Sequence, residues 1–511
     1  MSSSEDLTGF QNLSGLNPKN IADLFLQQAH KQPEVAAILE KGDEISYGEL
    51  RAEVFAYAGY LREKGIGKRD RVLVFVPVSI QLYKVVLAII AIGAVPVFLD
   101  QWSSLKRLKQ SAELADCKGL VAGWKLRLLA FFIPEFRKIP LKLNPTKKAR
   151  PITQTEEMGP EDAALITFTT GSSGSPKAAW RTHDFLFQQH QALMKELKPK
   201  QGDVNMTTLP VFVFSNLAAG LTTILPEFNP RKPEKLNPSW ILEDLEKAST
   251  LICSPDLLMR LVPHAEHYNL AGLTEVFTGG APVSPQMAVA IQKRFPQTIV
   301  AYGSTEAEPI SSISIKELAG YYDSEPKGIP VGKLHEDIQL KIIPVTDKPI
   351  APNADEWLSL GLPEKEIGEV MVAGPHVLKK YYQNPEAQSR QKFEVNGQLW
   401  HRTGDSGFLD ESGNLFLTGP VKYLFKRDDL WVGQFPIEIQ LNKLPSIQEA
   451  TILNKNGEIT IFLVKKKGVL DNAVKEEISN AEISYDRIEY LDALPKDPRH
   501  HSKIEYGKLL S

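Results

Sequence analysis

The sequence predicts an α/β protein whose large N-terminal region is built on doubly wound, mostly parallel sheets. Short continuous apolar runs, typical of buried parallel strands, alternate with helical segments through residues 71–304. From about residue 320 short strands separated by turns indicate an antiparallel, barrel-like subdomain. After Lys422 a hairpin, a helix and a strand indicate a small α+β domain. We therefore expect α/β subdomains over 1–320, a β-rich subdomain over 321–421 and a C-terminal domain over 422–511.

The predicted N-terminal elements follow one another in a regular alternation. They are a helix, a hairpin and a second helix within 20–63, a strand at 71–77, a helix to about Ile92, a strand at 94–100 and a helix from about Ser103. Four later strands are expected at "TTLPV", "STLICSP", "EVFTGG" and "TIVAYGST". This β-α-β-α alternation is the signature of a doubly wound sheet.

The β-rich and C-terminal segments carry their own turn signals. "DIQLKIIPV", "EVMVAGP" and "FLDESGNLFLTGP" predict short antiparallel strands. In "EATILNKNGEITIFLVKK" the pair Asn456–Gly457 fits a primed turn between two alternating runs, which predicts a hairpin. A helix near 472–482 and a strand near 486–491 complete the last unit.

Composition excludes several classes of function. A chain of 511 residues is too long for one core. Its net charge of −3 argues against a general nucleic-acid binder. Cys117 and Cys253 form no CxxC pattern, which favours a reducing, cytoplasmic setting. The apolar run 85–99 is interrupted by Gly93 and Pro96 and is shorter than the roughly 20 residues of a membrane span. We expect no transmembrane segment and no signal peptide.

Residues 124–150 break this neutral balance. The segment carries eight lysines and arginines against the single acid Glu135, and apolar side chains interleave with the charges. One interpretation is peripheral contact with an anionic membrane, or guidance of a lipid-like substrate. The other is a solvated connector whose apolar side packs on the domain, and this is the commoner outcome for such a segment.

Residues 169–177, "TTGSSGSPK", form a loop of small groups after an apolar run. Glycine lets backbone amides approach a ligand closely, hydroxyls add donors, and the final lysine supplies a positive charge. That combination suits a polyphosphate, although the spacing is not that of the GxxxxGK[ST] loop. Alone, such a loop is more often a linker. The candidate residues are Thr169, Thr170, Gly171, Ser172, Ser173, Gly174 and Lys177.

Further candidate residues follow other predicted strands, where ligands bind in open α/β sheets. Glu306 is a hard oxygen donor suited to magnesium beside a phosphate. Asp405 lies at a turn and suits the two vicinal hydroxyls of a ribose, and Lys503 lies near the chain end. The segments at the strand ends contribute Gly279, Gly280 and Ala281, and Tyr302, Gly303, Ser304, Thr305 and Glu306.

Five segments together, from "GAVPVFLD" at 93–100 to "SKI" at 502–504, resemble the superfamily of adenylate-forming, AMP-binding enzymes. Acyl-CoA synthetases, luciferases, nonribosomal-peptide adenylation domains and the β-lactone synthetases of olefin biosynthesis belong to it. "TTGSSGSPK" and "YGSTE" are specific together. The resemblance implies an N-terminal adenylation domain over 1–421 and a mobile lid domain over 422–511, with Lys422 as the hinge.

The resemblance also implies a role for each site residue. The loop from Thr169 to Lys177 would cradle the β- and γ-phosphates of ATP. Thr305 would contact the α-phosphate, Glu306 would bind magnesium, and Asp405 would hold the ribose. Lys503 would stabilise charge as a carboxylate oxygen attacks the α-phosphorus, and a rotation about Lys422 would then admit a second nucleophile. Gly279, Gly280, Ala281, Tyr302 and Gly303 would border the adenine and the acyl group.

Several positions differ from the family pattern. "GPVK" at the domain junction has Pro420 in place of an arginine, whose role Lys426 or Arg427 would have to take. Trp431 stands where CoA ligases commonly have a glycine along the pantetheine path. Val213 and Phe214 lie where relatives line the acyl pocket, and their apolar character indicates a long aliphatic acid.

The resemblance therefore implies an ATP- and magnesium-dependent enzyme that activates an aliphatic, long-chain carboxylic acid to an acyl-adenylate and releases pyrophosphate. Transfer to CoA is the expected second step. One alternative is β-lactone closure of a 3-hydroxy acid, because the segment 374–410 and the extended junction loop resemble the β-lactone synthetases more closely. A second alternative is a nucleotide-binding relative with impaired catalysis.

Overall fold

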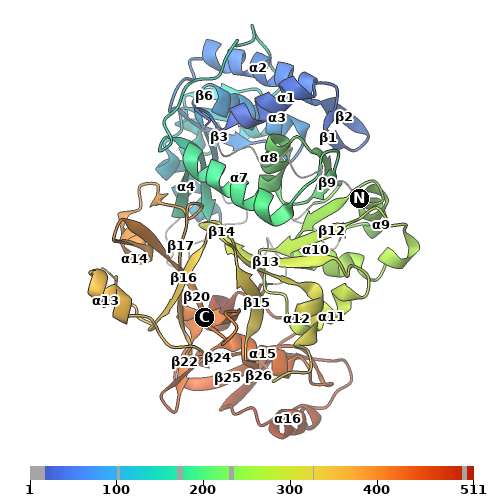
Figure 1. Cartoon of the computed structure of the whole chain (residues 1–511), viewed down its shortest axis with the longest axis vertical. Coiled ribbons are helices and arrows are strands. Elements are labelled where there is room, and N and C mark those ends of the chain that lie inside the picture. The colour runs from blue at the N-terminus through green and yellow to red at the C-terminus, as the bar shows by residue number, and fades with distance from the viewer. Residues whose placement is uncertain are drawn as a thin grey trace, which may run out of the picture.

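Two large sheets and a small C-terminal domain follow one another along the longest axis of the molecule (Figure 1). The structure is a computed structural model and describes residues 18–99, 104–169, 177–229, 235–325, 327–350, 352–497 and 503–511. Five of the predicted loop residues, Thr170 to Gly174, lie outside these ranges, and so does the side chain of Thr169.

The first sheet has seven strands in the order β18-β8-β7-β4-β3-β5-β6. Neighbouring strands from β7 to β6 are parallel, whereas β8 and β18 are antiparallel additions. The strands are β3 (Arg71–Phe75), β4 (Val95–Phe98), β5 (Gly119–Ala122), β6 (Leu141–Leu143), β7 (Ala163–Thr169), β8 (Lys177–Thr182) and β18 (Lys380–Tyr381). Helices of this part are α1 (Ala22–Lys31), α2 (Tyr47–Glu63), α3 (Ile80–Ala91), α4 (Leu105–Ala115), α5 (Trp124–Leu129) and α6 (Pro134–Arg137).

Helices α2 and α3 form the core beneath this sheet. The α3 sequence is apolar on nearly every side, and all residues from Leu82 to Ala91 are buried. Helix α2 begins with a capping box in which Ser46 and Glu49 satisfy each other's backbone amides. The predicted helix start at Tyr47 is thereby confirmed.

The second sheet has fourteen strands, and its main path runs β16-β17-β20-β21-β15-β14-β13-β12-β11-β9-β10-β1-β2, with β19 paired to β20. Its parallel part contains β1 (Ala36–Glu40), β9 (Val204–Thr207), β10 (Thr222–Leu225), β11 (Thr250–Cys253), β12 (Glu275–Gly279) and β13 (Thr298–Ser304), and β2 (Asp43–Ser46) is an antiparallel edge. Its helices are α7 (His183–Leu197), α8 (Pro210–Ala219), α9 (Pro238–Leu245), α10 (Pro255–Leu261), α11 (Pro285–Gln292) and α12 (Ile315–Gly320).

Most predicted elements of this sheet are confirmed, and one is corrected. The segment "TTLPV" was expected to be a strand, but strand β9 ends at Thr207 and helix α8 begins at Pro210. Proline has no amide hydrogen and a fixed φ, so it suits the first turn of a helix better than a central strand.

The β-rich segment extends the second sheet. Strand β15 pairs with β14 on one side and with β21 on the other, so the antiparallel strands continue the parallel ones. Among the described residues no ladder closes these strands into a barrel. The elements are β14 (Ala307–Ser314), β15 (Ile329–Leu334), β16 (Gln339–Ile343), α13 (Ala354–Ser359), β17 (Gly368–Ala373), α14 (Pro385–Gln391), β19 (Lys392–Val395), β20 (Gln398–Leu409) and β21 (Leu415–Pro420).

The C-terminal domain is the predicted small α+β unit. Its hairpin of β24 (Ile447–Lys455) and β25 (Glu458–Lys465) turns at Asn456–Gly457, and both residues have positive φ. Strand β26 (Arg487–Tyr490) joins this sheet in parallel. The remaining elements are a 3-10 turn (Val421–Tyr423), β22 (Phe425–Arg427), β23 (Leu430–Val432), α15 (Gln434–Leu441), α16 (Asp471–Asn480) and α17 (Tyr506–Leu509). The fold class, a large α/β domain with a smaller C-terminal domain, is therefore confirmed.

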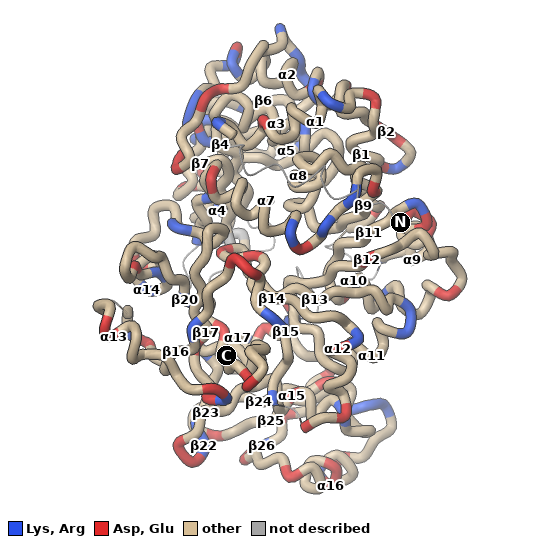
Figure 2. The backbone as a smooth tube through the Cα atoms, viewed as in Figure 1, with Lys and Arg blue, Asp and Glu red and all other residues tan. Residues whose placement is uncertain are grey.

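Two global properties agree with the sequence analysis. Lysine and arginine segments are interspersed with aspartate and glutamate segments along the whole tube (Figure 2). No helix in the described ranges has the length and apolar character needed to cross a bilayer.

Candidate active site

Two of the predicted segments lie side by side at the ends of neighbouring parallel strands. Gly279 ends β12 and is in register with Ala301 of β13. A Cβ on Gly279 would lie 2.7 Å from the Ala301 carbonyl oxygen, so only glycine fits this close approach. Gly280 follows with a φ of +82°. The strand ends thus bring the Gly279–Ala281 segment beside Tyr302 and Gly303.

Thr305 and Glu306 occupy the tight turn between β13 and β14, where Ser304 pairs with Ala307. The turn is held from two other elements. Arg181 of β8 donates from Nη2 to the Thr305 carbonyl at 3.4 Å, and the Leu378 amide donates to the Glu306 carbonyl at 2.7 Å. The first sheet therefore fixes a turn that belongs to the second sheet.

The Glu306 carboxylate faces a hydroxyl and two ammonium groups. Tyr381 donates from its hydroxyl to Glu306 Oε1 at 3.0 Å. Strand β18 brings Tyr381 there by pairing it with Ala179, two residues after Lys177. Burial lowers the pKa of the Lys177 ammonium, and the charge of Glu306 partly offsets that effect. Lys177, the last residue of the predicted phosphate loop, therefore lies beside Glu306.

Lys392 is a second buried cation at this place. Its Nζ lies 3.3 Å from His401 Nδ1 and 5.3 Å from the ring centroid of Tyr381. Burial lowers the pKa of Lys392 to about 7; Glu306 acts to raise it and Lys177 to lower it further. Lys177 and Lys392 together create positive potential beside the Thr305–Glu306 turn, which suits phosphate oxygens.

The residues at this turn also fit a magnesium ion. The described residues contain no cluster of three or more histidine, cysteine or carboxylate side chains. Magnesium bound with a nucleotide needs only one or two carboxylates, because phosphate oxygens and waters complete its shell. Glu306 meets that requirement, since Tyr381 is bonded to Oε1 and the carboxylate keeps further lone pairs.

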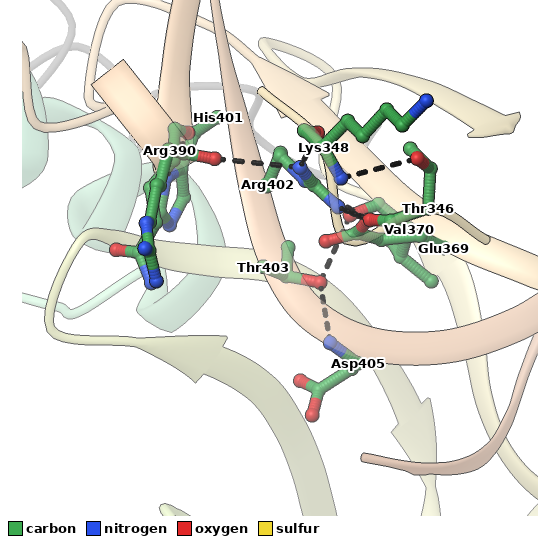
Figure 3. Close-up of polar contacts among 10 residues, drawn as sticks. Thr346, Lys348, Glu369, Val370, Arg390, His401, Arg402, Thr403 and Asp405 are labelled. Atoms are coloured by element: carbon green, nitrogen blue, oxygen red, sulfur yellow. Dashed lines mark hydrogen bonds and ion pairs between the residues drawn. The ribbon is translucent and has the colours of Figure 1, made fainter. Parts of the chain in front are cut away.

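Asp405 is presented by a buried network in "HRTGD" (Figure 3). Arg402 is only 8% exposed and donates from Nε to Glu369 Oε2 at 2.9 Å and from Nη1 to the Lys348 carbonyl at 2.9 Å. Thr403 Oγ1 donates to the Val370 carbonyl and accepts from the Asp405 amide. This network fixes the backbone on both sides of Gly404, so that the Asp405 side chain is held in one place.

Asp405 then meets Tyr302 and Lys503. The Tyr302 hydroxyl donates to Asp405 Oδ2 at 2.8 Å. Burial raises the pKa of the Asp405 carboxyl, while the positive charge of Lys503 and the bond from Tyr302 partly offset this. The charge of Lys503 therefore favours the ionised form of Asp405, although 98 positions separate the two residues in the sequence.

The position of Lys503 is fixed by backbone pairing within the C-terminal domain. Lys496 and Ile504 form an isolated antiparallel bridge, and the Asp497 amide donates to the Lys503 carbonyl at 2.8 Å. The side chains of Tyr506 and Leu509 then bury themselves in the C-terminal core. Backbone pairing thus anchors the predicted catalytic lysine to Asp497 within the C-terminal domain.

The junction residues have a clear geometry. Pro420 lies directly opposite Asp405 in the β20–β21 ladder. The proline that replaces the family's arginine therefore borders the residue predicted to hold the ribose. Lys426 lies over the Trp431 ring, and Arg427 donates to the Ser484 carbonyl at 2.8 Å. Both contacts lie within the C-terminal domain, and compensation for the missing arginine by Lys426 or Arg427 stays a prediction. Lys422 lies in the 3-10 turn between the domains, and its hinge role stays a prediction.

Two predicted acyl-pocket residues pack into the N-terminal core. Val213 is fully buried there, and Phe214 makes an edge contact with Tyr83. Their acyl-pocket role stays a prediction. The opposite side of helix α8 carries Phe212, which joins a separate apolar cluster with Leu193, Leu197, Ile252 and Phe277. Phe277 is two residues before Gly279, so this cluster reaches the predicted site.

Sequence reasoning missed four residues that shape the site: Arg181, Tyr381, Lys392 and Arg402. Arg181 follows the phosphate-loop motif in "KAAWRT". A charged residue in an otherwise apolar, buried strand could have indicated that it has a specific partner. Tyr381 and Lys392 come from a segment expected to belong to the β-rich subdomain. Only the return of β18 to the first sheet brings Tyr381 to Glu306.

The candidate site lies where the two large sheets meet, and Lys503 of the small C-terminal domain lies close enough to act on Asp405. The AMP-binding enzyme family matches this chain over residues 25–382. The chain belongs to that family and is an AMP-forming ligase.

Curated relatives extend this similarity over nearly the whole chain. An olefin β-lactone synthetase of Stenotrophomonas maltophilia is 26% identical and covers 96% of this chain and 97% of its own length. The 4-coumarate–CoA ligase 3 of Arabidopsis thaliana is 25% identical and covers 89% and 85%. The amide bond synthetase McbA of Marinactinospora thermotolerans shares the fold with a TM-score of 0.80 at 21% identity, over 96% and 99%.

Proposed function

We propose that this enzyme uses ATP to activate an aliphatic carboxylic acid as an acyl-adenylate and releases pyrophosphate. The observation that carries the proposal is the convergence of Lys503, the Tyr302–Asp405 pair and the Thr305–Glu306 turn. A cytoplasmic site of action is consistent with Cys117 and Cys253, which are free and buried.

The proposed chemistry uses this chain's charges at separate parts of ATP. Asp405 accepts hydrogen bonds from the ribose hydroxyls, and Lys177 and Lys392 face the phosphates. A carboxylate oxygen of the acid attacks the α-phosphorus, the bond to the β-phosphate oxygen breaks, and pyrophosphate leaves. Lys503 stabilises the negative charge that develops on the α-phosphate. Glu306 would hold a magnesium ion, which would further neutralise the charge of the triphosphate.

The nature of the acid is proposed from the apolar surroundings of Gly279. Phe212 of α8, Ile252 of β11 and Phe277 of β12 pack together in one apolar cluster and expose almost nothing to solvent. An aliphatic chain fits such a lining better than a polar acid, and we propose a long one.

Two second steps are candidates. Transfer of the acyl group to CoA would form a thioester and release AMP. The 4-coumarate–CoA ligase relative is named for a ligation to CoA. Closure of a 3-hydroxy acid to a β-lactone needs no CoA, and the β-lactone synthetase relative covers almost all of the chain. Trp431, on the hairpin β22–β23 beneath Lys426, favours lactone closure because a large ring occupies the position expected to be a glycine.

The test is a two-stage assay with purified enzyme. Pyrophosphate–ATP exchange is first measured across straight-chain fatty acids and their 3-hydroxy forms. The products are then identified with and without CoA. A thioester formed only with CoA supports the ligase, and a β-lactone plus AMP without CoA supports closure. Absence of exchange with every acid would support the impaired nucleotide binder and overturn the proposal.

A further inference from the structure

The segment 124–132 exposes an unusual group of large apolar side chains. Phe132 is 77% exposed and Trp124 is 66% exposed. Six of the thirteen large apolar side chains exposed in the described part of the chain lie within these nine residues. We name them the 124–132 patch: Trp124, Leu126, Leu128, Leu129, Phe131 and Phe132.

A fixed scaffold holds the patch outward. Helix α5 continues into further turns, in which the Ala130 amide donates to Leu126 and the Phe132 amide donates to Leu129, both at 2.9 Å. Ala130, Phe136 and Ile139 are buried in the core of the first sheet. The connector interpretation therefore holds for these three side chains, whereas the six side chains of the patch are between 39% and 77% exposed.

Basic side chains surround the patch. Lys125 lies over the Trp124 ring at 5.5 Å. Lys138, directly after α6, pairs with Glu113 of α4 at 3.5 Å, which places α4 beside the basic segment that follows the patch. Lys106 and Lys109 lie on the same face of α4 as Glu113, because residues three and four apart share a helix face. We name Lys106, Lys109, Lys125, Arg137 and Lys138 the basic rim. Of the acids on α4 and in residues 124–138, Glu113 pairs with Lys138 and Glu135 is half-buried.

The patch lies at the same edge of the first sheet as the phosphate side of the active site. Strand β5 ends at Ala122, directly before the patch, and strand β7 ends at Thr169, directly before the phosphate loop. Both strands run in parallel, with β3 and β4 between them. Neighbouring strands are about 4.8 Å apart, so the two strand ends are separated by about 14 Å.

We propose that the 124–132 patch and the basic rim dock this protein on an anionic phospholipid bilayer. Apolar and aromatic side chains enter the boundary of the acyl chains, while a cationic rim binds anionic headgroups. The rim argues against pairing of two copies through the patch, because a symmetric contact would bring like charges together. Docking there would turn the strand edge of the active site toward the membrane. If the proposed function holds, an aliphatic acid would enter directly from lipid.

The test is flotation of the full-length protein with vesicles of phosphatidylcholine alone or mixed with phosphatidylglycerol. We expect binding to the mixed vesicles, weak binding to the neutral ones, and loss of binding at high salt. Phe131→Ser/Phe132→Ser and Lys125→Glu/Arg137→Glu should each lower binding by about ten-fold or more. All four side chains are exposed, so folding should be unaffected.

Matched variants separate the patch from general stickiness. Leu358→Ser/Leu470→Ser removes two leucines that are 75% and 76% exposed elsewhere, and Lys467→Glu/Lys475→Glu reverses charge on the C-terminal domain. Both should bind vesicles as the unchanged protein does. Pyrophosphate–ATP exchange with a short, soluble acid should persist in every variant, so failure of docking is distinguishable from failure of the proposed function.

Three results would overturn the proposal. They are absence of binding to the mixed vesicles, binding that the Phe131→Ser/Phe132→Ser variant retains, and equal loss in the matched variants. Self-association that the phenylalanine variant abolishes, without vesicle binding, would assign the patch to a contact between copies.

Discussion

Tyr302 donates from its hydroxyl to Asp405 Oδ2 at 2.8 Å, and this bond joins strand β13 to strand β20 across 103 positions of sequence. The bond orients the carboxylate in a buried place where its pKa is already raised by burial. The orientation of Asp405, which is predicted to hold the ribose, therefore depends on Tyr302, which is predicted to border the adenine.

Replacement of Tyr302 by phenylalanine should weaken nucleotide binding. The hydroxyl donates to a carboxylate, and bonds to charged groups contribute about 1.5–3 kcal/mol, so we expect the KM for ATP to rise by about ten-fold or more. Tyr321→Phe is the matched control, because that ring packs on Phe416 away from Asp405. An unchanged KM in Tyr302→Phe would contradict the role of this pair.

Loss of the Tyr381 hydroxyl should affect the magnesium requirement. Tyr381→Phe keeps the ring in its buried cluster but removes the donor to Glu306 Oε1. We expect the magnesium concentration for half-maximal exchange to rise several-fold, with little change in melting temperature. Tyr382→Phe is the control, since its hydroxyl accepts from Gln383 and its ring stacks on Trp180. Equal magnesium dependence in both variants would argue against the Tyr381–Glu306 contact.

The buried Arg402–Glu369 pair should behave as a unit. Burial raises the pKa of the Glu369 carboxyl, and Arg402 acts against that rise. Arg402→Leu leaves a buried carboxylate without its partner and should cost about 3–5 kcal/mol in the free energy of unfolding. The double variant Arg402→Leu/Glu369→Leu should recover part of that loss. Chemical denaturation measures both, and additive losses would contradict the coupling.

Glu438 of α15 should make stability depend on pH. Burial raises its pKa from 4.5 to about 7, although Thr451 and Tyr506 donate hydrogen bonds to it. Below the pKa of Glu438 in the unfolded chain, the carboxyl is protonated in both states. Its burial then carries no free-energy cost from removing a charge from water. As pH rises from 4.5 through 7 the unfolded state ionises first, so the folded state loses stability.

The matching variant is Glu438→Gln, whose amide oxygen still accepts from Thr451 and Tyr506. It should be more stable than the unchanged protein by on the order of 3 kcal/mol at about pH 8, and the gain should vanish below about pH 4. Thermal unfolding across this range measures the difference. A gain that is constant with pH would rule out titration of Glu438.

Local patterns were sufficient for much of the fold but not for contacts between distant segments. Asn456–Gly457 predicted its hairpin because the turn chemistry is contained in two residues. The placement of Gly279 beside Tyr302 followed from the rule that parallel strands share one ligand edge. The attachment of the β-rich strands to the second sheet was not predicted, because pairing of β15 with β14 is a long-range choice between two sheets. Tyr381 was missed for the same reason, since a two-residue strand gives no periodic signal.

We propose that Lys503 promotes adenylate formation beside Asp405, and acid-dependent pyrophosphate–ATP exchange measures that role. The Lys503→Ala variant should lose exchange almost completely while still binding ATP. Lys508→Ala should retain it, because Lys508 is exposed and pairs with Glu505. Exchange in Lys503→Ala equal to that of Lys508→Ala would contradict the account.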